Sequence, residues 1–108
     1  MDLQVRSEVH GEWEVVVVSG ELDAETVPTL SDHLERVAAS RLVVDLAEVR
    51  FMDSTGLALL VDWHRRLDGS FRLAAPRPAV HKLFRLTDLT GVMSIHDSVG
   101  QATSAQEA

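Results

Sequence analysis

The sequence has no cysteine and few basic residues, and both shortages exclude classes of function. Without cysteine the chain forms no disulfide and offers no thiol nucleophile or thiolate metal ligand. Its 10 lysines and arginines are outnumbered by 17 aspartates and glutamates, which gives a net charge of −7. Because a protein that holds a nucleic acid needs a basic face, nucleic-acid binding is not expected.

Long hydrophobic runs are also missing. The longest, Val15 to Val18, is far shorter than the ~20 residues of a membrane helix, and the first residues lack the basic and apolar regions of a signal peptide. We therefore expect a cytoplasmic protein without membrane contact. A chain of 108 residues supplies one hydrophobic core but not two. We expect a single domain over residues 1–108, with its core at about 3–100 and a frayed polar tail over 101–108.

Segments typical of strands and of helices alternate along the chain. Apolar runs predict strands at 13–18, 42–46, 71–75 and 92–95, the first two buried on both faces. Residues 3–10 predict an edge strand that turns at Gly11 and pairs with the first run. Apolar residues three and four apart predict helices after Asp23, over about 55–67 and over 80–86, and a weak helix follows Ser98.

Strands joined by helices imply βαβ units and right-handed crossovers. We therefore predict an α/β domain with a mixed, mostly parallel sheet of four to five strands, an antiparallel N-terminal edge and about four helices. Asp23 is predicted to cap the first helix, with Pro28 in its first turn. A left-handed Gly69 is predicted to end the 55–67 helix.

The segment whose side chains are suited to carry chemistry is 49–57, where Asp53, Ser54 and Thr55 meet at the junction of a strand and a helix. A hydroxyl there lies near unpaired backbone N–H groups and the positive end of a helix dipole, which stabilise an added phosphoryl group. Gly56 permits a close approach of the backbone. The alternative is a plain cap, in which the hydroxyl of Ser54 or Thr55 accepts a backbone N–H, and this role is the more common one.

Residues 51–57, with the sequence FMDSTGL, resemble the signature of the STAS domain and in particular of bacterial anti-sigma factor antagonists. Four further segments resemble the family in the same order. They are VSGELD at 18–23, LVVDL at 42–46, AVHKLF at 79–84 with Leu86, and LTG at 89–91. The resemblance covers roughly residues 12–100 and implies the STAS fold.

The resemblance also implies a partner switch. The unmodified antagonist binds an anti-sigma factor that is a serine kinase with a histidine-kinase-like ATPase fold, and this binding releases a sigma factor for transcription, as in stress responses. The kinase phosphorylates the hydroxyl that follows the motif's aspartate, here Ser54, with Thr55 as the second candidate. The phosphorylated form dissociates, and a PP2C-type phosphatase restores it. The domain is then a substrate and a competitor rather than an enzyme, and it needs no cofactor.

We expect the partner to dock around Ser54, because loops that follow neighbouring parallel strands emerge at one edge of the sheet. Leu59 and Trp63 lie one helical turn apart and are candidate anchors, although core packing is the more common role for each. The predicted docking residues are Gly20, Glu21, Asp23, Asp53, Ser54, Thr55, Gly56, Leu59 and Trp63.

Other functions have less support. The five histidines, at positions 10, 33, 64, 81 and 96, lack the spacing of a metal site, and neither a phosphate-binding loop nor a nucleophile elbow is present. The main alternative is a STAS subunit of an ABC-type phospholipid transport complex, which shares the fold and a related motif. An enzyme that acts through Asp53 and Ser54 ranks last.

Overall fold

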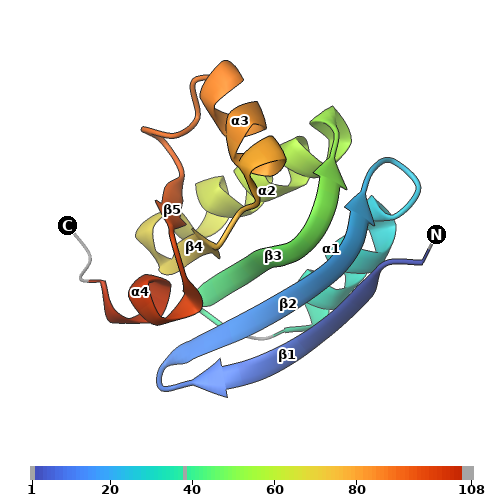
Figure 1. Cartoon of the computed structure of the whole chain (residues 1–108). Helices are drawn as coiled ribbons and strands as arrows, with labels where there is room; N and C mark the ends of the chain where they lie inside the picture. Colours follow the sequence, from blue (N-terminus) through green and yellow to red (C-terminus); the bar gives the residue numbers. More distant parts are fainter. Residues whose placement is uncertain (1, 38, 106–108) are drawn as a thin grey trace.

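The chain is organised by a five-stranded sheet in the order β1-β2-β3-β4-β5, with β1 antiparallel to β2 and all other neighbours parallel (Figure 1). The computed structural model describes residues 2–37 and 39–105. The strands are β1 (Gln4–His10), β2 (Trp13–Leu22), β3 (Leu42–Met52), β4 (Phe71–Ala74) and β5 (Ser94–His96). The helices are α1 (Val27–Arg36), α2 (Ser54–Leu67), α3 (Pro78–Leu86) and α4 (Val99–Ser104), with a 3-10 turn, η1, at Asp68–Ser70. The predicted mixed α/β fold is confirmed.

The N-terminal edge is the predicted hairpin. Gly11 and Glu12 form a two-residue loop between His10 and Trp13, which pair directly across the strands. Gly11 has a φ of +63°, whereas Glu12 does not have a positive φ. This combination fits a type II′ turn, whose twist matches that of the two strands. The predicted turn at Gly11 is confirmed.

Both faces of β2 are buried, as the uninterrupted run of valines predicts. Val16 and Val18 belong to the larger core, which contains residues of α1, α2 and α3. Val15 and Val17 point to the other face and pack in a smaller cluster with Ala102 of α4. Three helices therefore cover one face of the sheet and α4 covers part of the other.

Two strands are longer than predicted. β2 continues through the predicted break at Gly20 to Leu22, and β3 continues past Leu46 to Met52. Their pairing persists because two register shifts, at Val17/Ser19 and Gly20/Glu21, absorb the irregular backbone. Polar residues and a glycine look like a strand end in the sequence, but a bulged parallel pair accommodates them.

Smaller corrections concern the ends of helices. α1 begins at Val27, with Pro28 in its first turn as predicted. After α2 the positive φ belongs to Asp68, at 51°, and not to Gly69. Aspartate tolerates this backbone region better than most residues, and a 3-10 turn follows directly. The last strand lies at 94–96 instead of 92–95.

The C-terminal helix α4 is anchored and not frayed up to Ser104. The buried Arg72 donates through Nη1 to the carbonyl oxygens of Ala102 and Ala105, both at 2.6 Å. The guanidinium groups of Arg72 and Arg41 lie over the ring of Trp13, at 4.4 and 4.7 Å from its centroid. The rest of the predicted tail, 106–108, lies outside the described residues. Among the helices of residues 2–37 and 39–105, none has the length and apolarity to cross a membrane.

Candidate functional site

Ser54 is the first residue of α2, two positions after the last residue of β3. Strands β2 and β3 end side by side at one end of the sheet (Figure 1). Leu22 and Met52, the last residues of these strands, are paired in register. The backbone N–H of Asp53 then donates to the carbonyl oxygen of Leu22 at 3.1 Å. Asp23 and Asp53 therefore follow adjacent strand ends, as predicted.

Asp53 caps helix α2. Its Oδ1 accepts hydrogen bonds from the backbone N–H groups of Thr55 at 2.9 Å and of Gly56 at 3.1 Å, and its carbonyl oxygen accepts from Leu57 at 3.0 Å. Its extended backbone, with φ −103° and ψ −173°, is typical of an N-cap. The predicted alternative, a hydroxyl cap from Ser54 or Thr55, is wrong because the carboxylate one residue earlier takes these N–H groups.

Ser54 is consequently left as an exposed hydroxyl at the first position of α2. Within the described residues its Oγ has no hydrogen-bond partner. It stands at the positive end of a 14-residue helix, which stabilises negative charge. Thr55, the second candidate acceptor, is also exposed, but its own N–H belongs to the Asp53 cap.

Gly56 fixes the start of α2 against the strand ends. A Cβ atom at this position would lie 2.9 Å from Leu22 Cγ and 3.0 Å from both Leu22 O and Met52 Cγ. Real Cβ atoms essentially never approach another atom as closely as 2.9 Å, and the two contacts at 3.0 Å, one of them to backbone, are tighter than most that occur. The close approach expected from the sequence is confirmed, and it sets the position of Ser54 relative to β2 and β3.

The neighbouring Asp23 holds the turn before α1. Its Oδ1 accepts from the backbone N–H groups of Glu25 and Thr26, each at 3.0 Å. Thr26 Oγ1 donates to the carbonyl oxygen of Glu21 at 2.7 Å. The backbone hydrogen bond from Thr26 is the main cause that lowers the pKa of Asp23. Asp23 therefore holds the turn that precedes α1, and the prediction that it caps the helix is wrong, because the N-cap position belongs to Thr26, three residues later.

The site lies within a match to a known family. A family model described as "Mlab, STAS domain" matches residues 5–95. The chain belongs to the STAS domain family. This STAS domain is 32% identical to the anti-sigma-B factor antagonist of Staphylococcus epidermidis over 103 residues, which cover 90% of this chain and 95% of the relative.

Solved structures share the fold of this STAS domain. An anti-sigma factor antagonist from Mycobacterium paratuberculosis aligns with a TM-score of 0.87 and 30% identity, over 95% of this chain and 92% of the other. The Bacillus cell fate determinant SpoIIAA in its phosphorylated form aligns with a TM-score of 0.66 and 25% identity, over 93% and 96% of the two chains. Its unphosphorylated form gives a TM-score of 0.74 at the same identity, over 93% of each chain.

The other predicted docking residues of the STAS domain differ in exposure. Gly20 has a φ of +122° in the bulged part of β2, and Glu21 beside it is half-buried. Leu59 is partly buried against the core. Trp63 is only 7% exposed and belongs to the core, with the Arg66 guanidinium 4.4 Å from its ring centroid. The side chain of Trp63 therefore packs in the core, which is the alternative role given for it in the sequence analysis.

Sequence reasoning missed one surface of the STAS domain beside the motif. Phe51, three residues before Ser54, is 49% exposed, and Leu86 at the end of α3 is 72% exposed. Both line a groove of about 230 Å³ between the end of β3 and α3, to which Arg50 and Lys82 also contribute. Apolar residues in a strand are expected in the core, so no local pattern distinguished Phe51 from a core residue.

The histidines of the STAS domain are separated. His33 Nε2 lies 2.7 Å from Ser7 Oγ, and His10 Nε2 lies 3.1 Å from a carboxylate oxygen of Glu8. Among residues 2–37 and 39–105, no group of three histidine, aspartate or glutamate side chains is placed to hold a metal ion.

Proposed function

We propose that this STAS domain is an anti-sigma factor antagonist whose binding is switched at Ser54. The unmodified chain binds an anti-sigma factor that is a serine kinase with a histidine-kinase-like ATPase fold, and a sigma factor is released. Phosphorylation of Ser54 ends the binding, and a PP2C-type phosphatase restores it. The observation that carries the proposal is the exposed hydroxyl of Ser54, which lies beside the Asp53 cap and has no hydrogen-bond partner among residues 2–37 and 39–105. The names of the relatives support it, as does the existence of SpoIIAA in a phosphorylated and an unphosphorylated form.

The cap explains how one phosphate acts as a switch. A phosphoserine carries about −1.5 to −2 charges at neutral pH. The N–H groups of Thr55 and Gly56, which would otherwise hold the phosphate, already bind Asp53 Oδ1. The new charge therefore stands beside the Asp53 carboxylate and lacks these two hydrogen bonds. Burying such a charge under a partner costs on the order of a few kcal/mol, and ~1.4 kcal/mol is a tenfold change in affinity.

The docking surface centres on residues 53–56 and the adjacent end of β2. Asp23 and Gly56 contribute by shape, because Asp23 holds its turn and Gly56 lets α2 begin against β2. Leu59 adds a half-buried apolar side chain. The groove lined by Phe51 extends this surface on its other side and gives it the apolar area that specific interfaces contain.

Paired baits test the proposal. Wild-type chain and the Ser54→Glu variant are exposed to host lysate, and captured proteins are identified by mass spectrometry. We expect the wild type alone to retain a kinase-like ATPase. Retention of that ATPase by both baits would contradict the charge switch, and capture of a transport ATPase would favour the transport-subunit alternative.

A reconstituted kinase reaction then tests the acceptor. The captured ATPase is incubated with ATP and with wild type, Ser54→Ala or Thr55→Ala, and incorporated phosphate is measured. We expect wild type and Thr55→Ala to be phosphorylated and Ser54→Ala to remain unmodified. Phosphorylation of Ser54→Ala with loss in Thr55→Ala would move the acceptor to Thr55.

A further inference from the structure

The outer edge of β1 is an unpaired strand edge in the described part of the chain. β1 is the terminal strand of the sheet, and within the described residues no other strand pairs with its outer side (Figure 1). It runs for 7 residues, QVRSEVH, in unbroken register with β2. Natural edges are usually shortened, bulged, or interrupted by proline or by charged residues of one sign that repel a second copy; β1 is long, regular and free of proline and lysine, and its charged residues Arg6 and Glu8 are of opposite sign. The opposite edge, β5, is only 3 residues long.

The backbone groups that face this edge follow from the hairpin. A β-turn is closed by a hydrogen bond between its end residues, so His10 directs its backbone groups toward Trp13. The direction alternates from residue to residue in an antiparallel pair. Val5, Ser7 and Val9 therefore present their N–H and C=O groups to the outer side.

We infer that β1 pairs with the β1 strand of a second copy of this chain, antiparallel and centred on Ser7. In this register each Arg6 faces Glu8 of the other copy, and each Val5 faces Val9 of the other copy. Opposite charges and apolar side chains are favourable cross-strand pairs. Since Val5, Ser7 and Val9 carry the outward backbone groups, they meet as hydrogen-bonded pairs and satisfy one another.

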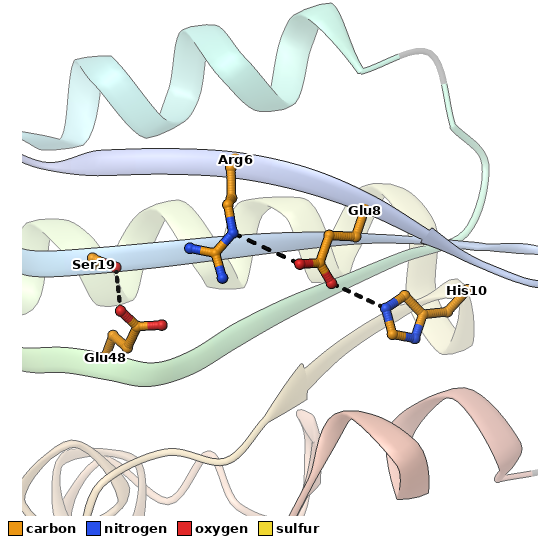
Figure 2. A network of polar contacts seen from close by, with 5 residues as sticks. All are labelled: Arg6, Glu8, His10, Ser19 and Glu48. Atoms are coloured by element: carbon orange, nitrogen blue, oxygen red, sulfur yellow. Dashed lines mark hydrogen bonds and ion pairs between the residues drawn. The ribbon is translucent and has the colours of Figure 1, made fainter.

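The side chains of β1 are already arranged for this contact. Arg6, Glu8 and His10 lie in a row on one face, with Arg6 Nε 3.7 Å and His10 Nε2 3.1 Å from the Glu8 carboxylate (Figure 2). Val9 points to the other face and is 73% exposed, although it is a large apolar residue. Val5 of the same face packs against the core. Pairing would place each exposed Val9 beside Val5 of the other copy, which already packs against the core of that copy.

The arrangement of charges along β1 favours a second copy of this chain as the partner. The whole molecule carries a net charge of −7, but β1 contains one arginine and one glutamate placed symmetrically about Ser7. An antiparallel copy of the same strand matches both charges and both valines at once. The contact is isologous, so it closes as a two-fold dimer with a continuous sheet and does not propagate. It uses neither Ser54 nor the groove beside Phe51.

Sedimentation equilibrium of the full chain tests this inference. We expect wild type to pass from monomer to dimer as concentration rises. Arg6→Glu puts like charges opposite each other twice and should weaken the dimer about tenfold. The double variant Arg6→Glu/Glu8→Arg restores both pairs and should restore the dimer. Recovery in the double variant would not follow from a merely damaged fold.

Variants at exposed valines supply the matched control. Val9→Lys adds a charge at the edge and should abolish the dimer, whereas Val92→Lys changes another exposed valine, 56% accessible, and should leave it intact. A wild type that stays monomeric up to the highest soluble concentration would overturn the inference. So would a dimer that is indifferent to Arg6→Glu and Val9→Lys.

A covalent trap tests the register. Because the chain has no cysteine, Ser7→Cys introduces the only thiol. At the two-fold axis its Cα atoms would lie about 5.5 Å apart, within the range that a disulfide spans. Mild oxidation of Ser7→Cys should give a linked dimer much faster than oxidation of Thr90→Cys, which lies in an exposed turn. Equal rates for both variants would contradict the proposed register.

Discussion

The backbone N–H of Asp53 donates to the carbonyl oxygen of Leu22 at 3.1 Å, so the start of α2 is tied to the end of β2. This bond joins two residues of the candidate site that lie 31 positions apart in the sequence. The position of Ser54 therefore depends on packing between strand ends and a helix start, and this packing can be tested separately from partner binding.

Gly56→Ala tests the close approach. The added Cβ would lie 2.9 Å from Leu22 Cγ and 3.0 Å from the Leu22 carbonyl oxygen, so α2 must shift away from β2. We expect a loss of about 1–3 kcal/mol in the free energy of unfolding, measured by urea denaturation. Gly91→Ala is the matched control because its added Cβ would meet no atom within 4 Å. Equal stability of both variants would show that the contact is not restrictive.

Asp53 variants separate capping from charge. Asp53→Ala removes the acceptor for the N–H groups of Thr55 and Gly56 and should cost about 1 kcal/mol of stability. Asp53→Asn keeps a good capping residue and should remain close to wild type in urea denaturation. If Asp53→Asn is as unstable as Asp53→Ala, the carboxylate charge at the helix start contributes more than the hydrogen bonds do.

Two histidines predict a loss of stability on acidification. Burial chiefly lowers the pKa of His33, with Arg36 adding to the effect, and burial with Arg72 lowers the pKa of His96. The unfolded chain then binds more protons than the folded chain near and just below the ordinary histidine pKa of 6.5, so the free energy of unfolding falls as pH decreases through that range.

The measurement is the thermal midpoint at several pH values between about 7.5 and 5.5, a window above the carboxylate titrations. We expect the midpoint of wild type to fall toward the acidic end. The double variant His33→Gln/His96→Gln should show a smaller fall. The same pH dependence in both proteins would mean that other groups are responsible.

Phe51→Ser tests the groove beside the motif. The side chain is 49% exposed, so its replacement should change the stability of the isolated chain little. If the groove contacts the anti-sigma factor, loss of an apolar anchor should weaken the complex by about tenfold or more, measured by isothermal titration calorimetry. Val92→Ser, which changes another exposed apolar residue, is the control. An unchanged affinity for Phe51→Ser would confine docking to the Ser54 side.

The hydrophobic pattern of the sequence predicted the fold correctly where apolar residues are in fact buried in the core. The valine run at 15–18 predicted a strand buried on both faces because alternate side chains enter two separate clusters. Gly20 was misread as a strand end because the sequence does not reveal that bulges keep β2 paired with β3. The C-terminal helix was underestimated because its anchor, Arg72, is distant in sequence and is buried against expectation for an arginine.

The candidate site was predicted in part. Family resemblance located Ser54, and strand order explains why Asp23 lies near Asp53. The identity of the cap was not predictable, since Asp53, Ser54 and Thr55 are all good capping residues and only the backbone geometry selects one. Phe51 was overlooked because exposure depends on where α3 packs, which a local pattern does not specify.

The two tryptophans make the sheet's two faces optically distinguishable. The chain has 2 tryptophans and no tyrosine. Trp13 packs in the cluster on the α4 face, with two guanidinium groups over its ring, whereas Trp63 belongs to α2 in the core on the other face. In a Trp13→Phe background the remaining fluorophore reports on the helix that begins at Ser54. In a Trp63→Phe background the emission reports instead on whether the C-terminal helix stays docked.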